Sequence, residues 1–342
     1  MNNRLLSAHE CQATDRVPFL PAIYEHKAWF VNSTPSSVCR DVNLFTNALI
    51  AEYERVQPDA LTIGIDVYNV EAEAIGCKIT YYDGDDASIP SIRSEDAVFR
   101  GREDITEKKI PNPMKDGRMP LHLEVAHNVV RVLGREVPIR GAVSGPFSLA
   151  AHLAGLEHLL MSTVMHQQLA QDLIKFATAV IKEYGEAYIH AGCGVVIFDS
   201  QASSTMISPE IYREFVLPAT KFLIDHFHAC GVRHVPLIIG GKTTPMLDAY
   251  LETGANNILC DTPSDVQQFR EACLKQKRAF RRNIDSREFL EASPEVLHQL
   301  AVERLKERQG YNGFILGTSV VPYGTPLENL KAIRDAVIEF KV

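Results

Sequence analysis

The stretch Val235-Pro-Leu-Ile-Ile-Gly-Gly-Lys-Thr-Thr-Pro-Met-Leu247, followed by Gly254-Ala-Asn-Asn-Ile-Leu-Cys-Asp261, decides the fold. An apolar run ends in Gly-Gly, Thr-Thr-Pro opens a helix, and a second apolar run ends in Cys-Asp. This order predicts a strand, a helix and a second strand of a parallel sheet, whose strands are apolar because helices cover them. Polar side chains at the ends of such strands are expected to face a pocket.

The same alternation continues along the whole chain. Short runs rich in apolar and β-branched residues are separated by stretches with a helical pattern. There are eight such runs, Val17–Tyr24, Ala60–Asp66, Val137–Ser144, Gly194–Asp199, Val235–Gly241, Asn257–Asp261, Ala279–Ile284 and Gly313–Ser319. Eight strands favour an α/β fold of the closed (β/α)8 TIM barrel type over an open sheet.

Length and composition agree with one large domain. The 342 residues, 46% of them hydrophobic, can bury a sizeable core, and no linker divides the chain. We therefore expect a single barrel domain over residues 1–342, with an N-terminal extension before the first strand. Residues 83–120 are rich in Asp, Gly, Pro and Lys, and they predict an inserted excursion that packs on the barrel or over its mouth.

Several helices have recognisable starts. A capping Ser followed by Pro-Glu predicts one helix from Ser208 to about His228 and another from Ser293. Ser264-Asp predicts a further start, and the last helix is expected to begin near Pro326. These helices would alternate with the predicted strands, as a barrel requires.

Charge and cysteine usage narrow the class of partner and the compartment. The net charge of −8 and the absence of a basic run disfavour nucleic acid and anionic membranes as partners, which leaves a small molecule. The N-terminus lacks the apolar core of a signal peptide, and no apolar run approaches the roughly 20 residues of a membrane-spanning helix. Seven scattered cysteines without a CxxC pair suit a reducing compartment. We expect a cytoplasmic protein.

Side chains able to do chemistry gather where the predicted strands end, and barrel enzymes build their sites there. The candidates for catalysis are Glu25, His26, Asp66, Tyr68 and Tyr323. The candidates for substrate binding are Asp199, Lys242, Arg282, Asn283, Asp285 and Ser319. Some of these residues could instead have a less specific role, because an acid after a strand often caps the next helix and a loop lysine is often only solvated.

Two adjacent arginines, Arg281 and Arg282, stand directly before Asn283. Neighbouring residues of a strand face opposite sides, so at most one of the two can point into the barrel. An inward guanidinium would suit an anionic group such as a substrate carboxylate. The alternative is a surface pair at a strand end.

A set of motifs in a fixed order carries a family resemblance. They are Arg16-Val-Pro-Phe-Leu-Pro21, Asp66-Val-Tyr-Asn-Val-Glu-Ala-Glu-Ala-Ile-Gly76, Ser144-Gly-Pro-Phe-Ser-Leu-Ala150, Ile207-Ser-Pro-Glu-Ile-Tyr212, Gly240-Gly-Lys-Thr-Thr-Pro245 and Pro322-Tyr-Gly-Thr-Pro-Leu-Glu-Asn329. On these motifs the chain resembles the uroporphyrinogen decarboxylase superfamily, in particular its branch of cobamide-dependent methyltransferases. The resemblance implies a (β/α)8 barrel with a deep cleft for a tetrapyrrole or a corrinoid-bearing partner, and a homodimer is common in the family.

The resemblance also implies a metal site whose ligands are absent here. Zinc-dependent members of the methyltransferase branch carry His-x-Cys near the Gly before Thr-Thr-Pro, and another Cys before the final Thr-Pro. The corresponding positions here are read as Leu237, Ile239 and Ser319. Neither Leu nor Ile can bind a metal, so zinc is not expected at the usual place. A relocated metal site would have to draw its ligands from among Glu25, His26, Asp66 or Cys260.

Three functions remain open. The leading one is an enzyme that moves a methyl group between a small molecule and a corrinoid on a carrier protein, with an acid near the leaving atom in place of zinc. The second is a decarboxylase or other lyase acting on a tetrapyrrole or an aromatic acid, but the cationic N-terminal motif of true decarboxylases is replaced here by Pro21-Ala-Ile-Tyr-Glu-His26. The third is a non-catalytic barrel that binds a corrinoid or a partner.

Overall fold

The computed structural model describes residues 4–342, and its centre is a single parallel sheet of eight strands. The strand order is β1-β10-β9-β8-β7-β6-β5-β2, so each strand lies beside its neighbour in the chain and the last strand pairs with the first. The strands are β1 (Phe19–Ala22), β2 (Leu61–Ile63), β5 (Ile139–Ser144), β6 (Gly194–Phe198), β7 (Leu237–Ile238), β8 (Asn257–Cys260), β9 (Ala279–Ile284) and β10 (Phe314–Val320). Each predicted run overlaps one of them, with the ends agreeing to within a few residues, which confirms the (β/α)8 fold.

The ring is completed between β1 and β2 by one residue rather than by a regular ladder. The Asp59 backbone N–H donates to the Phe19 carbonyl at 2.9 Å, and the Phe19 N–H donates to the Asp59 carboxylate at 2.7 Å. The Asp59 carboxylate also pairs with Arg16 at 2.8 Å. The Asp59 side chain therefore replaces one backbone-to-backbone hydrogen bond where β1 and β2 meet and the barrel closes.

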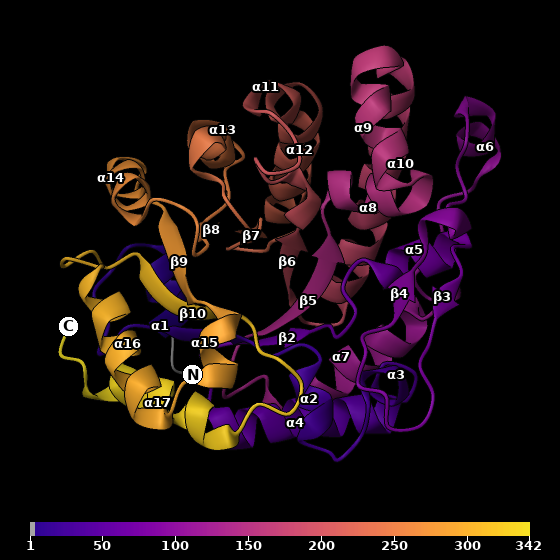
Figure 1. Cartoon of the computed structure of the whole chain (residues 1–342). Coiled ribbons are helices and arrows are strands. Elements are labelled where there is room, and N and C mark those ends of the chain that lie inside the picture. Colours follow the sequence, from indigo (N-terminus) through magenta and orange to yellow (C-terminus); the bar gives the residue numbers. More distant parts are fainter. Residues whose placement is uncertain (1–3) are drawn as a thin grey trace.

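Helices surround the sheet, and Figure 1 shows them following the strands around its outer side. They are α1 (Arg4–His9), α2 (His26–Trp29), α3 (Pro35–Val38), α4 (Val42–Val56), α5 (Asn69–Ile75), α6 (Arg102–Glu107), α7 (Met119–Leu133), α8 (Pro146–Ala154), α9 (Leu156–Met165), α10 (Gln167–His190), α11 (Pro209–Ile211), α12 (Leu217–Ala229), α13 (Leu247–Glu252), α14 (Val266–Gln276), α15 (Ser286–Glu291), α16 (Pro294–Lys306) and α17 (Leu327–Glu339). Short 3-10 turns occur at η1 (Ser94–Asp96), η2 (Ser200–Ala202) and η4 (Thr244–Met246), and η3 (Tyr212–Val216) is a π-helical segment. Within residues 4–342, no helix combines the length and the apolar character needed to cross a membrane.

The predicted helix starts agree with the structure to within a few residues. Ser208 and Ser293 each accept a backbone N–H and cap α11 and α16. The cap of α14 is Asp265, one residue after the predicted Ser264. The helix from Ser208 is not regular, because it widens into η3 just before Pro218. Proline lacks the N–H of a regular helical turn, and a π-helical turn is one way to absorb that loss.

The N-terminal extension and the excursion lie at opposite ends of the barrel. In α1, Leu5 and Ala8 form a small apolar cluster with residues near the start of several strands, Leu20, Ala60, Ala279 and Ile315. The excursion contains the antiparallel pair β3 (Ile79–Thr80) and β4 (Ser91–Ile92), and it packs on α8 through hydrogen bonds from two backbone N–H groups to the Leu153 carbonyl. Residues 89–92 also reach the cavity described below, so the excursion lies both on the barrel and over its mouth.

Candidate active site

A cavity of about 440 Å³ opens at the carboxyl ends of the strands. Its wall is mainly apolar, with polar side chains at a few places, as in most small-molecule sites. The predicted site residues that it brings together are Glu25, Asp66, Tyr68, Asn283 and Ser319. Its further polar members include His152, Ser200, Asp261 and Arg281.

Glu25, three residues after the end of β1, has a carboxyl group without a full set of partners. Its side chain is buried, and its Oε2 has no hydrogen-bond partner among the described residues. Burial in this apolar wall raises the pKa of Glu25 to about 7. A carboxyl group with that pKa can accept or donate a proton near neutral pH.

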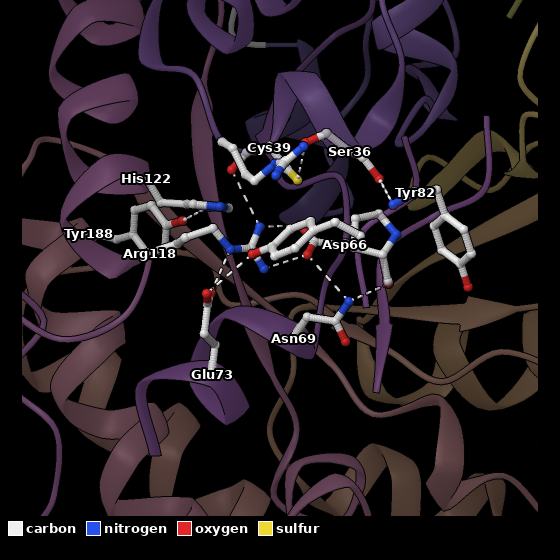
Figure 2. A network of polar contacts seen from close by, with 12 residues as sticks. Ser36, Cys39, Asp66, Asn69, Glu73, Tyr82, Arg118, His122 and Tyr188 are labelled. Atoms are coloured by element: carbon white, nitrogen blue, oxygen red, sulfur yellow. Dashed lines mark hydrogen bonds and ion pairs between the residues drawn. The ribbon is translucent and has the colours of Figure 1, made fainter. Parts of the chain in front are cut away.

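Asp66 forms a two-point ion pair with Arg118. The two terminal nitrogens of Arg118 donate to its two carboxylate oxygens at 3.1 and 2.6 Å, and the Arg118 Nε donates to Glu73 at 2.5 Å (Figure 2). Asn69 donates to Asp66 at 3.3 Å and to the Pro90 carbonyl, which ties this network to the excursion. A carboxylate in a two-point ion pair is suited to fixing the geometry of the wall rather than to donating a proton.

Tyr68 lies across the cavity in a strained backbone conformation. Its φ of 87° lies in a region that non-glycine residues rarely adopt, at a cost of about 1–3 kcal/mol. The hydroxyl donates to the Ser200 Oγ at 3.0 Å, and the ring stacks on His152 with 5.4 Å between ring centres. Burial raises the pKa of Tyr68, so the phenol stays protonated and remains a hydrogen-bond donor.

Asp261 accepts hydrogen bonds from several residues in another part of the cavity wall. Its Oδ1 accepts from Asn283 at 3.1 Å and from Ser319 at 3.3 Å, and its Oδ2 accepts from the Gly241 N–H at 2.8 Å. The Oδ1 of Asn283 has no hydrogen-bond partner among residues 4–342. Asp261 therefore joins β8, β9 and β10 to the Gly-Gly turn after β7, and helix capping is not its role.

The assignment of the missing zinc-ligand positions to Leu237 and Ile239 does not agree with the structure. Leu237 and Ile239 are completely buried in the core between the strands and the helices, whereas Ile238 and Gly240 line the cavity. The cause is the alternation of a strand, in which a shift by one residue exchanges the two faces. The residues of this segment that face the site are an isoleucine and a glycine, and neither side chain can bind a metal.

The residues present do not fit a zinc site with nitrogen and sulfur ligands in this cavity. Of the candidate ligands for a relocated site, His26 and Cys260 are buried and do not line the cavity, and the Asp66 carboxylate is paired with Arg118. Within residues 4–342, the group of potential ligands whose donor atoms lie within 4.8 Å of one another is Glu186, His226 and Cys230, none of which lines the cavity.

Of the two adjacent arginines, the structure brings Arg281 and not Arg282 to the cavity. The Arg282 side chain points to the helical layer, where its Nε donates to Glu307 at 2.9 Å and an Nη donates to the Asp261 carbonyl at 3.0 Å. The expectation that at most one of the two arginines points inward is confirmed, but the substrate-binding role assigned to Arg282 does not fit its position. Arg281 lines the cavity instead.

Two further residues proposed for catalysis lie outside the cavity. His26 is completely buried and packs edge-to-face on Phe30, and burial lowers the pKa of its imidazole to about 4. The Tyr323 hydroxyl donates to the Ser33 carbonyl at 2.9 Å, and its ring packs on Trp29. The His26 and Tyr323 side chains therefore pack within the segments that follow β1 and β10.

Three residues proposed for substrate binding also lie outside the cavity wall. Asp285 caps α15 through the Arg287 N–H at 3.0 Å. Asp199 accepts from the Ser148 N–H at 2.7 Å and so binds the first turn of α8, while burial raises its pKa to about 6. The Lys242 side chain is exposed and is not part of the cavity wall.

Four contributors to the site were not predicted from the sequence, namely Arg118, His152, Ser200 and the segment 89–92. Arg118 and residues 89–92 belong to the excursion, whose path over the barrel has no periodic pattern. His152 lies within a helix, where a histidine on an apolar face is usually a packed core residue. Ser200 follows Asp199 directly and could have been found from its place at a strand end.

A parallel barrel with a substrate-sized cavity at the carboxyl ends of its strands defines the class of (β/α)8 barrel enzymes. Within that class the chain belongs to the uroporphyrinogen decarboxylase (URO-D) family, whose family model matches residues 1–340. This membership confirms the resemblance inferred from the motifs.

Named relatives fall into two groups of enzymes. The methylated-thiol–coenzyme M methyltransferase of Methanosarcina mazei is 28% identical over 85% of this chain and 76% of its own length. The methylcobamide:CoM methyltransferase MtbA of Methanosarcina acetivorans is 31% identical over 61% of this chain and 60% of its own. The uroporphyrinogen decarboxylase of Geobacter sulfurreducens is 26% identical over 95% of both chains. All three are named as enzymes, in agreement with the expectation of an enzyme.

A solved structure supports the fold. A methyltransferase from Methanosarcina mazei superposes with a TM-score of 0.87 at 23% identity, covering 99% of this chain and 98% of that one. At this level of identity the likeness concerns the fold.

Proposed function

We propose that this enzyme transfers a methyl group between a small sulfur compound and a corrinoid presented by a carrier protein. The methyltransferase names of two relatives support this reading. The observation that carries it is Glu25, a buried carboxyl group with an unpartnered oxygen and a pKa of about 7, in the wall of the cavity. A thiol that accepts a methyl group must lose a proton, and Glu25 is placed to take it.

Glu25 and its neighbours would work as follows. When the thiol accepts the methyl group, its S–H bond breaks, the proton passes to the Glu25 carboxylate, and the sulfur electron pair forms the bond to the methyl carbon. The corrinoid supplies the methyl group and keeps the electron pair of the carbon–cobalt bond. In the opposite direction, protonated Glu25 returns its proton to the departing sulfur. General acid–base catalysis of this kind contributes roughly 10²- to 10⁴-fold.

The rest of the wall would orient the sulfur compound and exclude water. Tyr68 presents a protonated hydroxyl held by Ser200, and the Asp66–Arg118 pair fixes the turn that carries Tyr68. Zinc is not needed in this scheme, because deprotonation by Glu25 replaces activation of the thiol by a metal. A homodimer and a cytoplasmic location are further parts of the proposal.

An anaerobic assay of the purified protein tests the proposal. Methylcobalamin and a thiol are mixed with the protein, and the change in the corrinoid absorbance bands is recorded beside the amount of methyl thioether formed. We expect thioether and demethylated corrinoid in equal amounts, and at least 100-fold slower formation with Glu25→Gln. Equal rates for the two proteins would contradict the role of Glu25.

A decarboxylase is the second candidate function. It is favoured by relatives that align over 95% of the chain, such as the Geobacter sulfurreducens enzyme, and by the cationic Arg281 in the cavity. It is disfavoured by Glu25 in the part of the cavity wall that follows β1. This residue is acidic, whereas the resemblance implies a cationic motif in this region of true decarboxylases. A reaction of the protein with a porphyrinogen that releases carbon dioxide, with no methyl transfer, would establish this alternative.

A further inference from the structure

A second, much smaller polar cavity lies inside the barrel, and we call it the floor cavity. Residues of β1, β2, β5, β6, β7, β8 and β9 line it, so it lies within the ring of strands. Its wall includes Ala60, directly before β2, and Asn257, the first residue of β8, which places it toward the amino ends of the strands. Its volume is about 10 Å³. A cavity needs roughly 10–15 Å³ to hold one water molecule, so the floor cavity has room for a single particle of that size.

The wall of the floor cavity contains polar atoms without hydrogen-bond partners. Asn257 is completely buried, and neither its Nδ2 nor its Oδ1 has a partner among residues 4–342. The Nε atoms of Arg140 and Arg281 are also buried and unpartnered. Buried polar groups in folded proteins almost always have a partner, so these atoms indicate a bound water molecule or ion. Three of the four are N–H donors, which favours a particle that accepts hydrogen bonds.

Two positive charges in this wall are not compensated. Arg281 is 5% exposed and forms no ion pair within residues 4–342, and the same holds for Arg140, whose Nη2 donates to the neutral Thr62 hydroxyl at 3.0 Å. Glu52 supplies an acid to the wall, but its carboxylate pairs with Lys27 at 3.3 Å. The Glu52 and Lys27 charges therefore cancel, and the two guanidinium groups remain.

The two guanidinium groups also act on each other. Burial and the neighbouring charge of Arg281 lower the pKa of Arg140 to about 10, so both groups still carry a full charge at neutral pH. Burying an unpaired charge is costly, and a second charge of the same sign adds repulsion. An anion between the two arginines would remove both costs and form hydrogen bonds with charged donors, which are among the strongest in proteins.

The size of the cavity decides which anion fits. Carboxylates, phosphate and sulfate contain several heavy atoms and exceed a space of about 10 Å³. A chloride ion is a single atom only slightly larger than a water molecule. Water also fits, but it brings no charge to compensate the two arginines.

We propose that the floor cavity binds one chloride ion, held by Arg140 from β5, Arg281 from β9 and the Asn257 amide from β8. The ion stabilises the folded barrel, because the unfolded chain does not bring these three side chains together. This inference does not depend on the proposed methyl transfer.

Thermal unfolding in different sodium salts tests the proposal. The melting temperature of the purified protein is measured in chloride, bromide and gluconate at equal ionic strength, so that general screening is the same in all three. Gluconate is too large for the cavity, whereas bromide is a single atom like chloride. We expect the melting temperature to rise by about 2 °C for each tenfold increase in chloride above its dissociation constant, with a similar rise in bromide and none in gluconate.

Variants assign the effect to the floor cavity. Arg281→Gln and Arg140→Gln each remove one of the two charges, and each should abolish the difference between chloride and gluconate. Both should also melt at a higher temperature than the wild type in gluconate, because an unpaired buried charge is gone. The matched control is Arg213→Gln, which removes an exposed arginine paired with Glu252 and should keep the full chloride effect.

Crystals of the wild-type protein grown in bromide locate the ion without any variant. We expect an anomalous scattering peak between the Arg140 and Arg281 guanidinium groups. Bromide crystals without that peak, equal melting temperatures of the wild type in chloride and gluconate, or an unchanged chloride effect in Arg281→Gln would each overturn the proposal and leave the floor cavity to water.

Discussion

The carboxylate of Asp66 and the guanidinium of Arg118 form a buried two-point ion pair, with N–O distances of 3.1 and 2.6 Å. The partners are 52 residues apart in the chain, and they join the loop after β2 to the residue that directly precedes α7. Because Arg118 also contacts Glu73, a single guanidinium fixes both ends of the segment that carries Tyr68.

Loss of either partner leaves a buried charge uncompensated. We expect Arg118→Gln to lower the free energy of unfolding by about 3–5 kcal/mol, measured by urea denaturation. The control is Arg213→Gln, which breaks an exposed ion pair with Glu252 and should cost less than about 1 kcal/mol. Similar losses in the two variants would show that the Asp66 pair does not stabilise the fold.

The proton-accepting role of Glu25 predicts a pH dependence. With a pKa of about 7, Glu25 is mostly protonated below pH 6 and mostly ionised above pH 8. The rate of thiol methylation under limiting substrate should therefore rise about tenfold per pH unit below 7 and level off above it. In Glu25→Gln this inflection should disappear, and a profile with the same inflection in both proteins would assign it to another group.

The same pKa shift affects stability. The folded-state pKa of Glu25 lies above the ordinary value of 4.5, so between pH 4.5 and 7 the folded protein binds more protons than the unfolded chain. The contribution of Glu25 to stability is therefore lost as the pH rises through this window. Glu25→Gln should be more stable than the wild type by about 1–3 kcal/mol at pH 8, with little difference at pH 4. A constant difference at both pH values would contradict the shift.

The register of β7 predicts where a zinc site could be restored. Ile238→His, Gly240→Cys and Ser319→Cys together place three metal-binding side chains at the cavity, and Gly240 has room for a Cβ because its nearest neighbour would lie at 3.5 Å. We expect this triple variant to bind about one zinc ion, measured by metal analysis after gel filtration. The matched variant with Leu237→His and Ile239→Cys in place of the first two should lose stability and bind none. Zinc binding by the second variant alone would show that the assigned register is wrong.

Packing between β5 and α10 gives a test of the barrel itself. A Cβ atom on Gly141 would lie 2.1 Å from the Tyr188 ring, so Gly141→Ala should lower the free energy of unfolding by about 3 kcal/mol or more. Gly194→Ala, at the start of the neighbouring strand, would place its Cβ at an ordinary 3.7 Å and should be nearly neutral. Equal effects would contradict the position of α10 against the sheet.

The sequence predicted the barrel well, because repeated apolar runs and capping residues are local signals. It located Glu25, Tyr68, Asn283 and Ser319 at the cavity, since each stands at or just after the end of a strand. It could not find Arg118, whose pairing with Asp66 depends on the path of an irregular segment. It also missed the face of β7, because a strand of two residues with glycines after it has no alternation to fix the register.

The interpretation of the arginine pair shows the same limit. Alternation correctly predicts that Arg281 and Arg282 face opposite sides, but the sequence alone does not reveal which one faces inward. Arg282 pairs with Glu307, which stands at the end of a helix 25 residues later in the chain. This pairing can be recognised only in the folded structure.

The most direct measurement is a single anaerobic reaction of the purified protein with methylcobalamin and 3-mercaptopropionate, followed by the corrinoid absorbance bands and by mass spectrometry of the thiol. Transfer of the methyl group to sulfur, lost in Glu25→Gln, is the predicted result. A protein that leaves methylcobalamin and the thiol unchanged, yet releases carbon dioxide from a porphyrinogen, would contradict the proposed methyl transfer.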